Sequence, residues 1–247
     1  MMGIQGRRCG ATRRIRYCLL LACASSLVLL SGCSEDAEPA TNPPSSSSYG
    51  VDTSEPAQRL AESPVIVFLG TSLTAGYGLP EDQAFPALIQ QRIEAEGLEY
   101  RVVNAGVSGD TSAGGLRRLD WLLRMPIAVL VLELGANDML RGLDVQALDQ
   151  NLEAILDRTA AAHPDARFVV AGMRSAPNLG ADYVDAFDRV YPTLAERHRA
   201  ALIPFLLEDV AAKRDLNQAD GIHPTAEGHE LIAERVWKRL GPMLKAN

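Results

Sequence analysis

The chain has 247 residues, with 24 lysines and arginines against 31 aspartates and glutamates, which gives a formal net charge of −7. This acidic balance argues against nucleic acid as a partner, because that role needs clustered positive charge. All four cysteines lie in the first 33 residues. The rest of the chain therefore cannot be held together by internal disulfides.

Residues 1–32 have the composition of an export signal. They contain five arginines and no acidic residue, and residues 17–30 form an apolar stretch of 14 residues, "YCLLLACASSLVLL". A membrane-spanning helix needs ~20 apolar residues, so this stretch is too short for one and fits the apolar region of a cleaved signal peptide. The alternative is a signal anchor that stays attached. Without the five arginines the balance is 19 basic against 31 acidic residues, a net charge of −12.

The signal ends in "LSGC", residues 30–33, which resembles the lipobox of bacterial lipoproteins. In that motif the signal peptide is cut before the cysteine, and the cysteine carries the lipid. The resemblance implies that Cys33 is lipidated and anchors the protein in the bacterial cell envelope. With Ser34 following the cysteine, it also implies sorting to the outer membrane, facing the periplasm.

Residues 33–63 are expected to form a lipidated, flexible tether. Residues 34–63 contain seven serines and four prolines and show almost no apolar periodicity. Such a segment cannot bury enough apolar surface to fold. As a flexible coil of 30 residues it spans about 30 Å on average, so the domain that follows can stand clear of a membrane surface.

The remaining residues, 64–247, are expected to form one domain. Short runs that are mostly apolar on both faces, as in a covered parallel sheet, alternate with longer amphipathic segments. This alternation predicts a doubly wound, mostly parallel α/β sheet. The expected strands are residues 65–69, 100–106, 127–135, 166–173 and 201–207, and the expected helices are residues 85–97, 116–124, 145–163, 185–200 and 226–240.

Four polar segments follow the ends of these strands. They are "GTSLTAGYG" after the first strand, "NAGVSGDTS" at the end of the second, "GANDM" at the end of the third and "DGIHP" beyond the fifth. In an open parallel sheet, ligands bind beyond the carboxyl ends of the strands. The four segments, although far apart in sequence, are therefore expected to line one edge of the sheet.

Together the four segments hold the groups that an ester hydrolase needs. Ser72 offers a hydroxyl nucleophile, His223 an imidazole base, and Asp220 a carboxylate three residues away that can orient the imidazole. Gly109 and Asn137 offer donors for an oxyanion. Each residue alone has an ordinary interpretation as a turn or cap residue, so the hypothesis rests on their joint occurrence at one sheet edge.

The same segments resemble the SGNH, or GDSL-type, hydrolases, and within them the bacterial thioesterase I/lysophospholipase L1/arylesterase branch. The matching text is "GTSLTAGYG", "VVNAGVSGDTSAGGL", "VLELGANDMLRG" and "DGIHPTAEGH", in the family's order. The resemblance implies a single three-layer α/β/α domain with a flavodoxin-like, five-stranded sheet. It also implies that Ser72, Asp220 and His223 form the catalytic triad. The backbone N–H groups of Ser72 and Gly109 and the side chain of Asn137 would then form the oxyanion hole.

A hydrolase of this type acts on acyl or aryl esters or thioesters through an acyl-enzyme on Ser72, and it needs no metal or cofactor. The expected partners are a small acyl ester or thioester and, through Cys33, the membrane. The protein is expected to be a monomer. Residues 139–144, just past Asn137, are expected to form one wall of the substrate pocket.

One residue departs from the family's pattern. Thr71 stands where the usual Gly-Asp-Ser-Leu has an aspartate. A threonine can still cap the helix that follows, although without the charge that favours a helix N-terminus. We expect the change to affect the stiffness of the loop and the pH optimum, not the reaction type.

Three other classes fit the segments less well. A phosphate-binding loop would need glycine where Ala75 stands, followed by a lysine that the segment lacks. The nucleophile elbow of α/β-hydrolases would need glycine at Thr74. A catalytically silent, lipid-anchored protein that binds acyl or glycan ligands remains an alternative, and loss of Ser72 or His223 would have favoured it.

A metal site is the fourth alternative. Its ligands would be Asp220, His223, Glu227 and His229. The last two are expected on the helix that begins near Thr225, turned away from His223.

Overall fold

The computed structural model describes residues 63–246. The predicted signal peptide, Cys33 and the tether up to residue 62 lie outside the described residues. The fold and the site below are built from residues 63–246.

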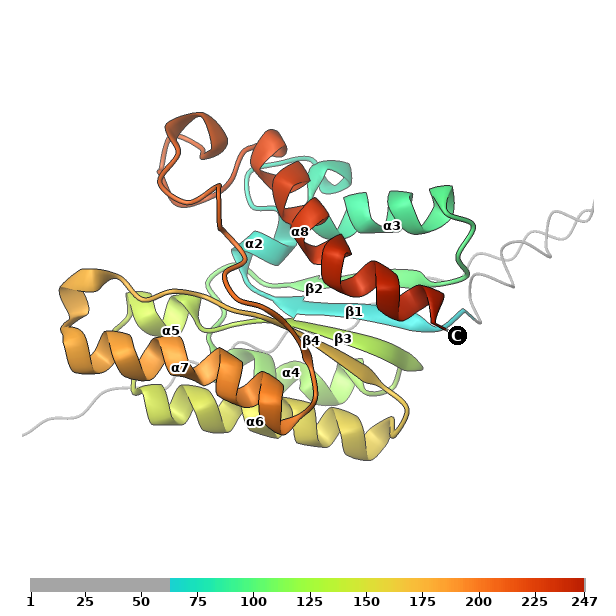
Figure 1. Ribbon diagram of the computed structural model, residues 1–247, viewed down its shortest axis with the longest axis horizontal. Helices are drawn as coiled ribbons and strands as arrows, with labels where there is room; N and C mark the ends of the chain where they lie inside the picture. Colours follow the sequence, from blue (N-terminus) through green and yellow to red (C-terminus); the bar gives the residue numbers. More distant parts are fainter. Residues whose placement is uncertain (1–62, 247) are drawn as a thin grey trace, which may run out of the picture. The chain divides into compact units, whose positions relative to one another are not determined.

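The described chain forms one five-stranded sheet in which every neighbouring pair of strands is parallel. The strand order is β2-β1-β3-β4-β5 (Figure 1). The chain therefore winds outward in both directions from β1, and the switch point lies between β1 and β3, where such sheets bind ligands. The strands are β1 Val65–Gly70, β2 Arg101–Gly106, β3 Ile127–Glu133, β4 Arg167–Ala171 and β5 Ala201–Ile203.

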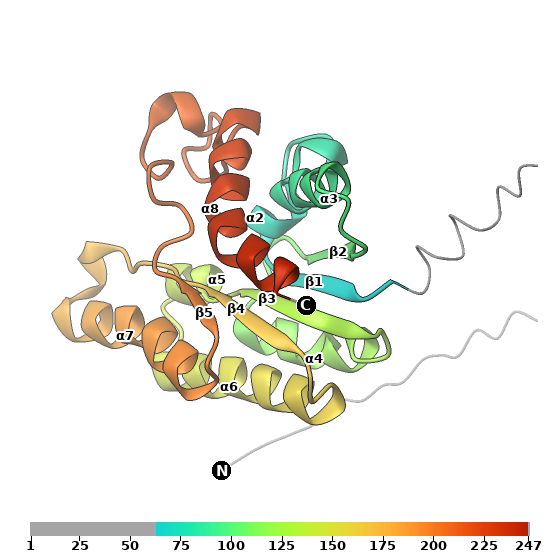
Figure 2. The same cartoon turned by 45° about the vertical axis from the view of Figure 1, so that its right-hand side comes forward.

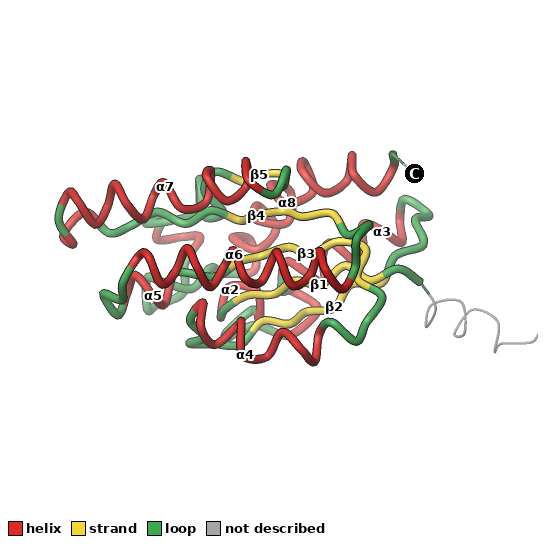
Figure 3. Tube along the Cα trace, turned by 90° about the horizontal axis from the view of Figure 1, so that it is seen from below, coloured by secondary structure: helices red, strands yellow, loops and turns green. Residues whose placement is uncertain are grey.

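Helices cover both faces of the sheet, as the doubly wound prediction requires. On one face lie α3 Phe85–Ala95 and α8 Ala226–Lys245, and on the other lie α4 Ser112–Leu122, α6 Val145–Ala162 and α7 Ala181–Arg197 (Figures 1 and 2). Figure 3 looks onto the face that α4, α6 and α7 cover. Short helices form turns beyond the strands: α2 Ser72–Ala75, η1 Glu81–Gln83, α5 Ala136–Leu140, η2 Pro177–Leu179 and η3 Arg214–Leu216.

The sheet is apolar because its strands are covered on both sides. Val65, Ile66, Val67, Phe68 and Leu69 have no exposed surface. A continuous apolar run of this kind is what a covered parallel strand requires. Among residues 63–246, no helix is both long and apolar enough to cross a membrane.

The predicted α/β fold and its five strands are confirmed, and among the strands the largest difference is at the fifth. β5 ends at Ile203, whereas the sequence predicted residues 201–207. Pro204 lacks an N–H and cannot continue the ladder. The chain then turns, and the N–H of Leu206 donates to the carbonyl of Gly172 at 2.9 Å.

The register of the sheet brings three strand ends to one level. Gly70, the last residue of β1, lies opposite Gly106 of β2 on one side and Glu133 of β3 on the other. The loops that follow these three strands therefore begin side by side. This alignment places the first three predicted polar segments at one edge.

His229, which was expected on the last helix and turned away from His223, is buried in α8. Its side chain in α8 is 1% exposed, and its Nδ1 accepts a hydrogen bond from the N–H of Phe85 at 3.1 Å. Burial, with a smaller contribution from His223, lowers the pKa of His229 from 6.5 to about 4. The ring is therefore neutral in the folded protein at pH 7.

We predict that His229 makes the fold acid-sensitive. The pKa of His229 is lower in the folded than in the unfolded chain, so the unfolded chain takes up a proton first as the pH falls. The stability that depends on a neutral His229 is therefore complete above pH 6.5 and is lost as the pH falls toward about 4. The shift corresponds to roughly 3 kcal/mol in the free energy of unfolding. Urea unfolding of the wild type should show this loss. A His229→Gln variant, whose amide oxygen can still accept from the Phe85 N–H, should lack this loss of stability. If the free energies of unfolding of the wild type and the variant fall in parallel with pH, His229 is not the cause.

Candidate active site

Ser72 lies in a tight turn that begins where β1 ends. Thr71 caps the four-residue helix α2, and its hydroxyl accepts from the N–H of Leu73 at 3.4 Å. The helix stops at Gly76, whose φ of 71° lies in the left-handed region that glycine favours. Ser72 is half-buried at the first position of this short helix.

His223 and Asp220 approach Ser72 from the loop that precedes α8. The Nε2 atom of His223 lies 2.9 Å from the Oγ of Ser72, and its Nδ1 lies 2.7 Å from the Oδ2 of Asp220. A carboxylate at Nδ1 favours the tautomer that carries its proton there, which leaves Nε2 free to accept the serine proton. The structure thus brings the three predicted triad residues into one hydrogen-bonded chain.

Asp220 is held as an anion by its own turn. Its Oδ1 accepts the backbone N–H groups of His223 at 3.0 Å and Ile222 at 2.9 Å. These bonds and the one from the His223 ring lower the pKa of Asp220 from 3.8 to about 2. The carboxylate is therefore ionised throughout the pH range in which a histidine can act as a base.

Gln218, which sequence reasoning missed, ties the His223 loop to the Ser72 loop. Its side-chain amide donates to the carbonyl of Tyr77 at 2.7 Å and to that of Pro224 at 2.9 Å. Its backbone N–H donates to the carbonyl of His223 at 2.7 Å. The ring of Tyr77 also packs against the His223 imidazole, with ring centroids 4.6 Å apart. The polar run "LNQADG" gave no sequence signal for this role.

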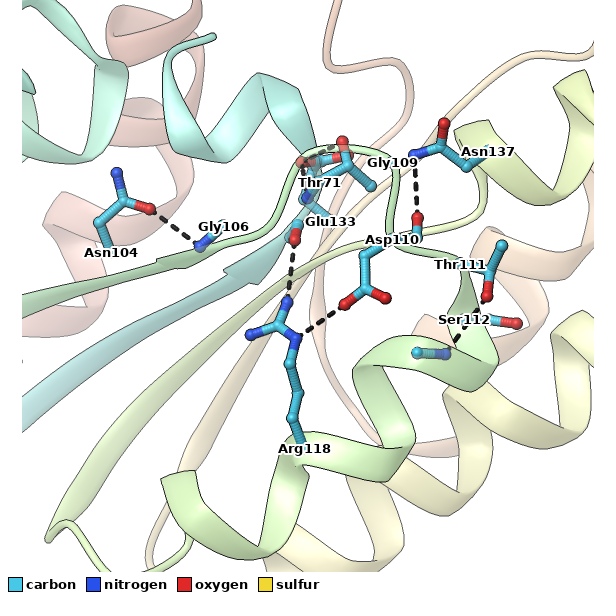
Figure 4. A network of polar contacts seen from close by, with 12 residues as sticks. Thr71, Asn104, Gly106, Gly109, Asp110, Thr111, Ser112, Arg118, Glu133 and Asn137 are labelled. Carbon is cyan, nitrogen blue, oxygen red and sulfur yellow. Dashed lines mark hydrogen bonds and ion pairs between the residues drawn. The ribbon is translucent and has the colours of Figure 1, made fainter. Parts of the chain in front are cut away.

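Gly109 and Asn137, the predicted oxyanion-hole residues, come from the loops after β2 and β3. Gly109 has a φ of 79°, a conformation that other residues rarely adopt. The Nδ2 of Asn137 donates to the carbonyl of Asp110 at 2.8 Å (Figure 4). Since an amide nitrogen carries two hydrogens, this bond orients the group and leaves one donor for a ligand. Arg141 donates to the carbonyl of Gly109 at 2.7 Å.

Buried and partly buried charges hold these loops together. Asp138 is 3% exposed and accepts from the N–H and the hydroxyl of Ser112, at 2.9 and 2.6 Å. Arg118 reaches from α4 to Asp110 at 2.7 Å and to the carbonyl of Gly70 at 3.0 Å (Figure 4). The loops after β1, β2 and β3 are thus linked by one ion pair and by several hydrogen bonds from side chains and backbone.

Glu133 is the other functional candidate that sequence reasoning missed. It is the last residue of β3, is 1% exposed, and accepts hydrogen bonds from Thr71 and Thr74 on either side of Ser72. A sequence signal existed, because Glu133 is the only acidic residue in the apolar run of residues 127–135. A charged residue in a covered strand indicates a buried partner.

Ser72, Gly109, Asn137 and His223 all line one cavity of about 350 Å³. Apolar side chains form much of its wall, together with Arg174: Leu73, Tyr77, Met139, Leu140, Met173, Phe205, Leu207 and Ile222. Met139 and Leu140 belong to the segment of residues 139–144 that was expected to form a wall. A hollow of about 530 Å³ lies at the opposite edge, around Pro64, Pro126 and Pro164. The predicted nucleophile, base and oxyanion-hole residues line the first cavity, and none of them lines this one.

Comparison with known proteins assigns the class of protein. Residues 68–231 match the GDSL-like Lipase/Acylhydrolase family. The chain is similar to Esterase TesA of Pseudomonas aeruginosa, with 43% identity over 185 residues that cover 74% of this chain and 91% of that protein. It is also similar to Thioesterase 1/protease 1/lysophospholipase L1 of Escherichia coli, with 39% identity over 188 residues, 75% of this chain and 88% of that protein.

A solved structure gives the same result. The psychrotrophic esterase EstA from Pseudoalteromonas sp., in a structure inhibited by monoethylphosphonate, superposes with a TM-score of 0.68 and 35% identity. The match covers 73% of this chain and 98% of that one. The chain therefore belongs to the GDSL-like lipase/acylhydrolase family. Within that family it is a hydrolase of carboxylic esters or thioesters.

Proposed function

We propose that this protein hydrolyses acyl esters or thioesters through a covalent acyl-enzyme on Ser72, with His223 as base and Asp220 as its orienting acid. The observation that carries the proposal is the hydrogen-bonded chain from Asp220 through His223 to Ser72 at the wall of a largely apolar cavity. A nucleophile, a base and an orienting group at such distances are the minimum for serine catalysis.

The reaction runs in two halves. His223 takes the proton of Ser72 at Nε2 while the serine oxygen attacks the acyl carbonyl. The negative charge that develops on the carbonyl oxygen is bound by the N–H groups of Ser72 and Gly109 and by the second amide hydrogen of Asn137. The alcohol or thiol leaves with the proton from His223, and water then repeats the cycle on the acyl-enzyme.

The substrate class follows from the cavity wall. Methionine, leucine, isoleucine and phenylalanine side chains beside Ser72 suit the apolar chain of an acyl group or an aryl ring. Relatives named as an esterase and as a thioesterase and lysophospholipase agree with this class. The intact chain from Ser72 to Asp220 favours hydrolysis over the alternative of a silent acyl- or glycan-binding protein.

The proposal places the enzyme on a membrane through lipid on Cys33, with residues 34–63 as the tether. The support is the arginine-rich start, the apolar stretch and the lipobox-like residues 30–33. A lipid anchor on this tether would hold the enzyme in the outer membrane, facing the periplasm.

We predict that Ser72 carries the activity. A fluorophosphonate probe should label Ser72 in the wild type. Ser72→Ala should abolish labelling and nearly all ester hydrolysis while circular dichroism stays unchanged, because the side chain is half-buried at the start of a short helix rather than in the core. Ser108→Ala, a change in the same cavity, is the matched control and should keep the label. EDTA should leave the rate unchanged.

Two outcomes would count against this proposal. Full activity in Ser72→Ala would mean that another group is the nucleophile. Loss of wild-type activity in EDTA, restored by added metal, would revive the metal-site alternative.

A second prediction separates transition-state binding from substrate binding. Asn137 is proposed to bind charge that exists only in the transition state, so Asn137→Ala should lower kcat by about 10²-fold or more and leave KM nearly unchanged. Asp220→Asn should lower kcat and also slow the labelling of Ser72, because it acts through His223. A rise in KM alone for Asn137→Ala would make Asn137 a substrate-binding residue instead.

The anchor is tested separately. Cys33→Ser should abolish incorporation of labelled palmitate and move the enzyme out of the membrane fraction, or leave its signal uncleaved. Cys23→Ser, within the apolar stretch, is the matched control and should still be labelled. Palmitate incorporation by Cys33→Ser would refute the anchor.

A further inference from the structure

Glu133 binds the Ser72 turn from beneath. Its Oε2 accepts the N–H of Thr71 at 2.9 Å, the N–H of Thr74 at 3.2 Å and the hydroxyl of Thr74 at 2.7 Å. The Thr71 hydroxyl lies 3.0 Å from Oε1 and 3.1 Å from Oε2 (Figure 4). Thr71 and Thr74 are themselves 1% and 0% exposed. Four donors from the residues flanking Ser72 therefore converge on one buried carboxyl group.

Two backbone N–H groups and the Thr74 hydroxyl converge on Oε2, which therefore acts as an acceptor. The Thr71 hydroxyl beside Oε1 can donate to an ionised carboxylate or accept from a neutral carboxyl. Two opposing effects act on the group: burial raises the pKa of Glu133, and the four hydrogen bonds lower it, with burial the larger. Hydrogen bonds from Thr71 and Thr74 hold the group, and a further acid beside it would raise its pKa still more.

Gly70 shows how closely the backbone passes the carboxylate. A Cβ atom at Gly70 would lie 2.0 Å from the Thr74 hydroxyl and 2.6 Å from Oε2 of Glu133. Any other residue would push the threonine and the carboxylate apart. The first glycine of "GTSL" is thus explained by the close approach of Thr74 and Glu133, and not by a turn that needs positive φ.

We propose that Glu133 is a positioning residue for Ser72. Thr71 is a hydroxyl donor where the family usually has an aspartate, so Glu133 is the sole carboxylate at the turn that holds Ser72. The absence of a second carboxylate keeps that turn in place at alkaline pH. The inference rests on the proposed role of Ser72. Oγ of Ser72 must point at Nε2 of His223 to within a few tenths of an ångström, and a displacement of 1 Å costs about 10²-fold in rate. The contacts of Glu133 fix the backbone on both sides of that oxygen.

Three other titratable residues of the described chain lie near Glu133 without contacting its carboxyl group. Tyr191 of α7 donates to the carbonyl of Leu134, and burial, with a smaller contribution from the charge of Glu133, raises the pKa of its phenol. Arg118 of α4 reaches the carbonyl of Gly70 but is paired with Asp110. The charge of Asp138 of α5 also raises the pKa of Tyr191.

The sharpest test replaces Thr71 by aspartate, the residue that the family usually has at this position. In Thr71→Asp a second carboxylate would stand about 3 Å from Glu133, and two carboxylates at that distance cannot both ionise without a large penalty. At low pH the pair shares one proton and the turn is held. As the pH rises and that proton is lost, kcat and the rate of fluorophosphonate labelling should fall together, with KM nearly unchanged. Thr71→Asn, which adds the same shape without the charge, should lack this alkaline loss, as should the wild type.

Removal of single donors gives an independent test. Thr74→Val keeps the shape but removes one hydrogen bond, so kcat should fall on the order of tenfold or more with KM nearly unchanged. Thr74→Ser should recover most of the loss. Thr159→Val, which removes a buried hydroxyl bonded to the Ile155 carbonyl in α6, is the matched control and should leave kcat unchanged even if it lowers stability.

The outcomes separate this inference from the proposed function. If the wild type is not labelled at Ser72, the proposed function fails. If the wild type is labelled, but Thr71→Asp keeps the wild-type pH profile or Thr74→Val keeps the wild-type kcat, the positioning role of Glu133 is wrong while the mechanism stands. If Thr159→Val loses as much kcat as Thr74→Val, the effect is general destabilisation, which also overturns the role.

Discussion

The carboxyl group of Glu133 imposes a constraint that the surrounding loops satisfy. It lies at the end of β3, the central strand of the sheet, where it is only 1% exposed to solvent. A buried polar group is tolerated when hydrogen-bond donors surround it. The turn that leaves the neighbouring strand β1 supplies four such donors from Thr71 and Thr74. The position of Ser72 is thereby set from inside the sheet, and not only by a solvent-exposed loop.

The other half of the site is built in a different way. His223 and Asp220 belong to a long loop before α8, and backbone N–H groups within that loop hold the Asp220 carboxylate. Gln218 then connects the loop to the Ser72 side through the carbonyl of Tyr77. Ser72, held rigidly from the sheet, thus faces His223. Hydrogen bonds within its own loop orient His223, and a few bonds between distant residues, such as Gln218 to Tyr77, attach that loop to the Ser72 side. Such an arrangement keeps the short bond between Ser72 and His223 without burying the histidine.

Much of this could be predicted from the sequence, for identifiable reasons. The covered strands are uninterrupted apolar runs, so their positions and the doubly wound sheet follow from periodicity, and the four polar segments mark the strand ends. The end of β5 was missed because the run from residue 201 to 207 stays apolar through Pro204, whose missing N–H ends the ladder. The register that aligns Gly70 with Glu133 is a contact between distant residues, which local patterns do not encode.

The side chains that support the site were harder to predict than the site itself. Ser72, Asp220 and His223 stand in segments with a recognisable pattern. Gln218 stands in a polar loop like many others, and its partners are set by the fold. Glu133 did leave a signal, as one acid in an apolar strand, but its donors could not be named before β1 and β3 were known to be neighbours. His229 was expected on the last helix, and its burial against Phe85 follows from how α8 packs on α3.

The claim that matters most is that an acyl group is transferred to Ser72 before water takes it. The most direct measurement is the partition of products in the presence of methanol, using phenyl, nitrophenyl and thiophenyl esters of one acyl group. If all three pass through the same acyl-enzyme, the ratio of methyl ester to free acid is identical whatever the leaving group. A ratio that changed with the leaving group would show that water and methanol attack the substrate directly, and the account of Ser72 as a covalent nucleophile would be wrong.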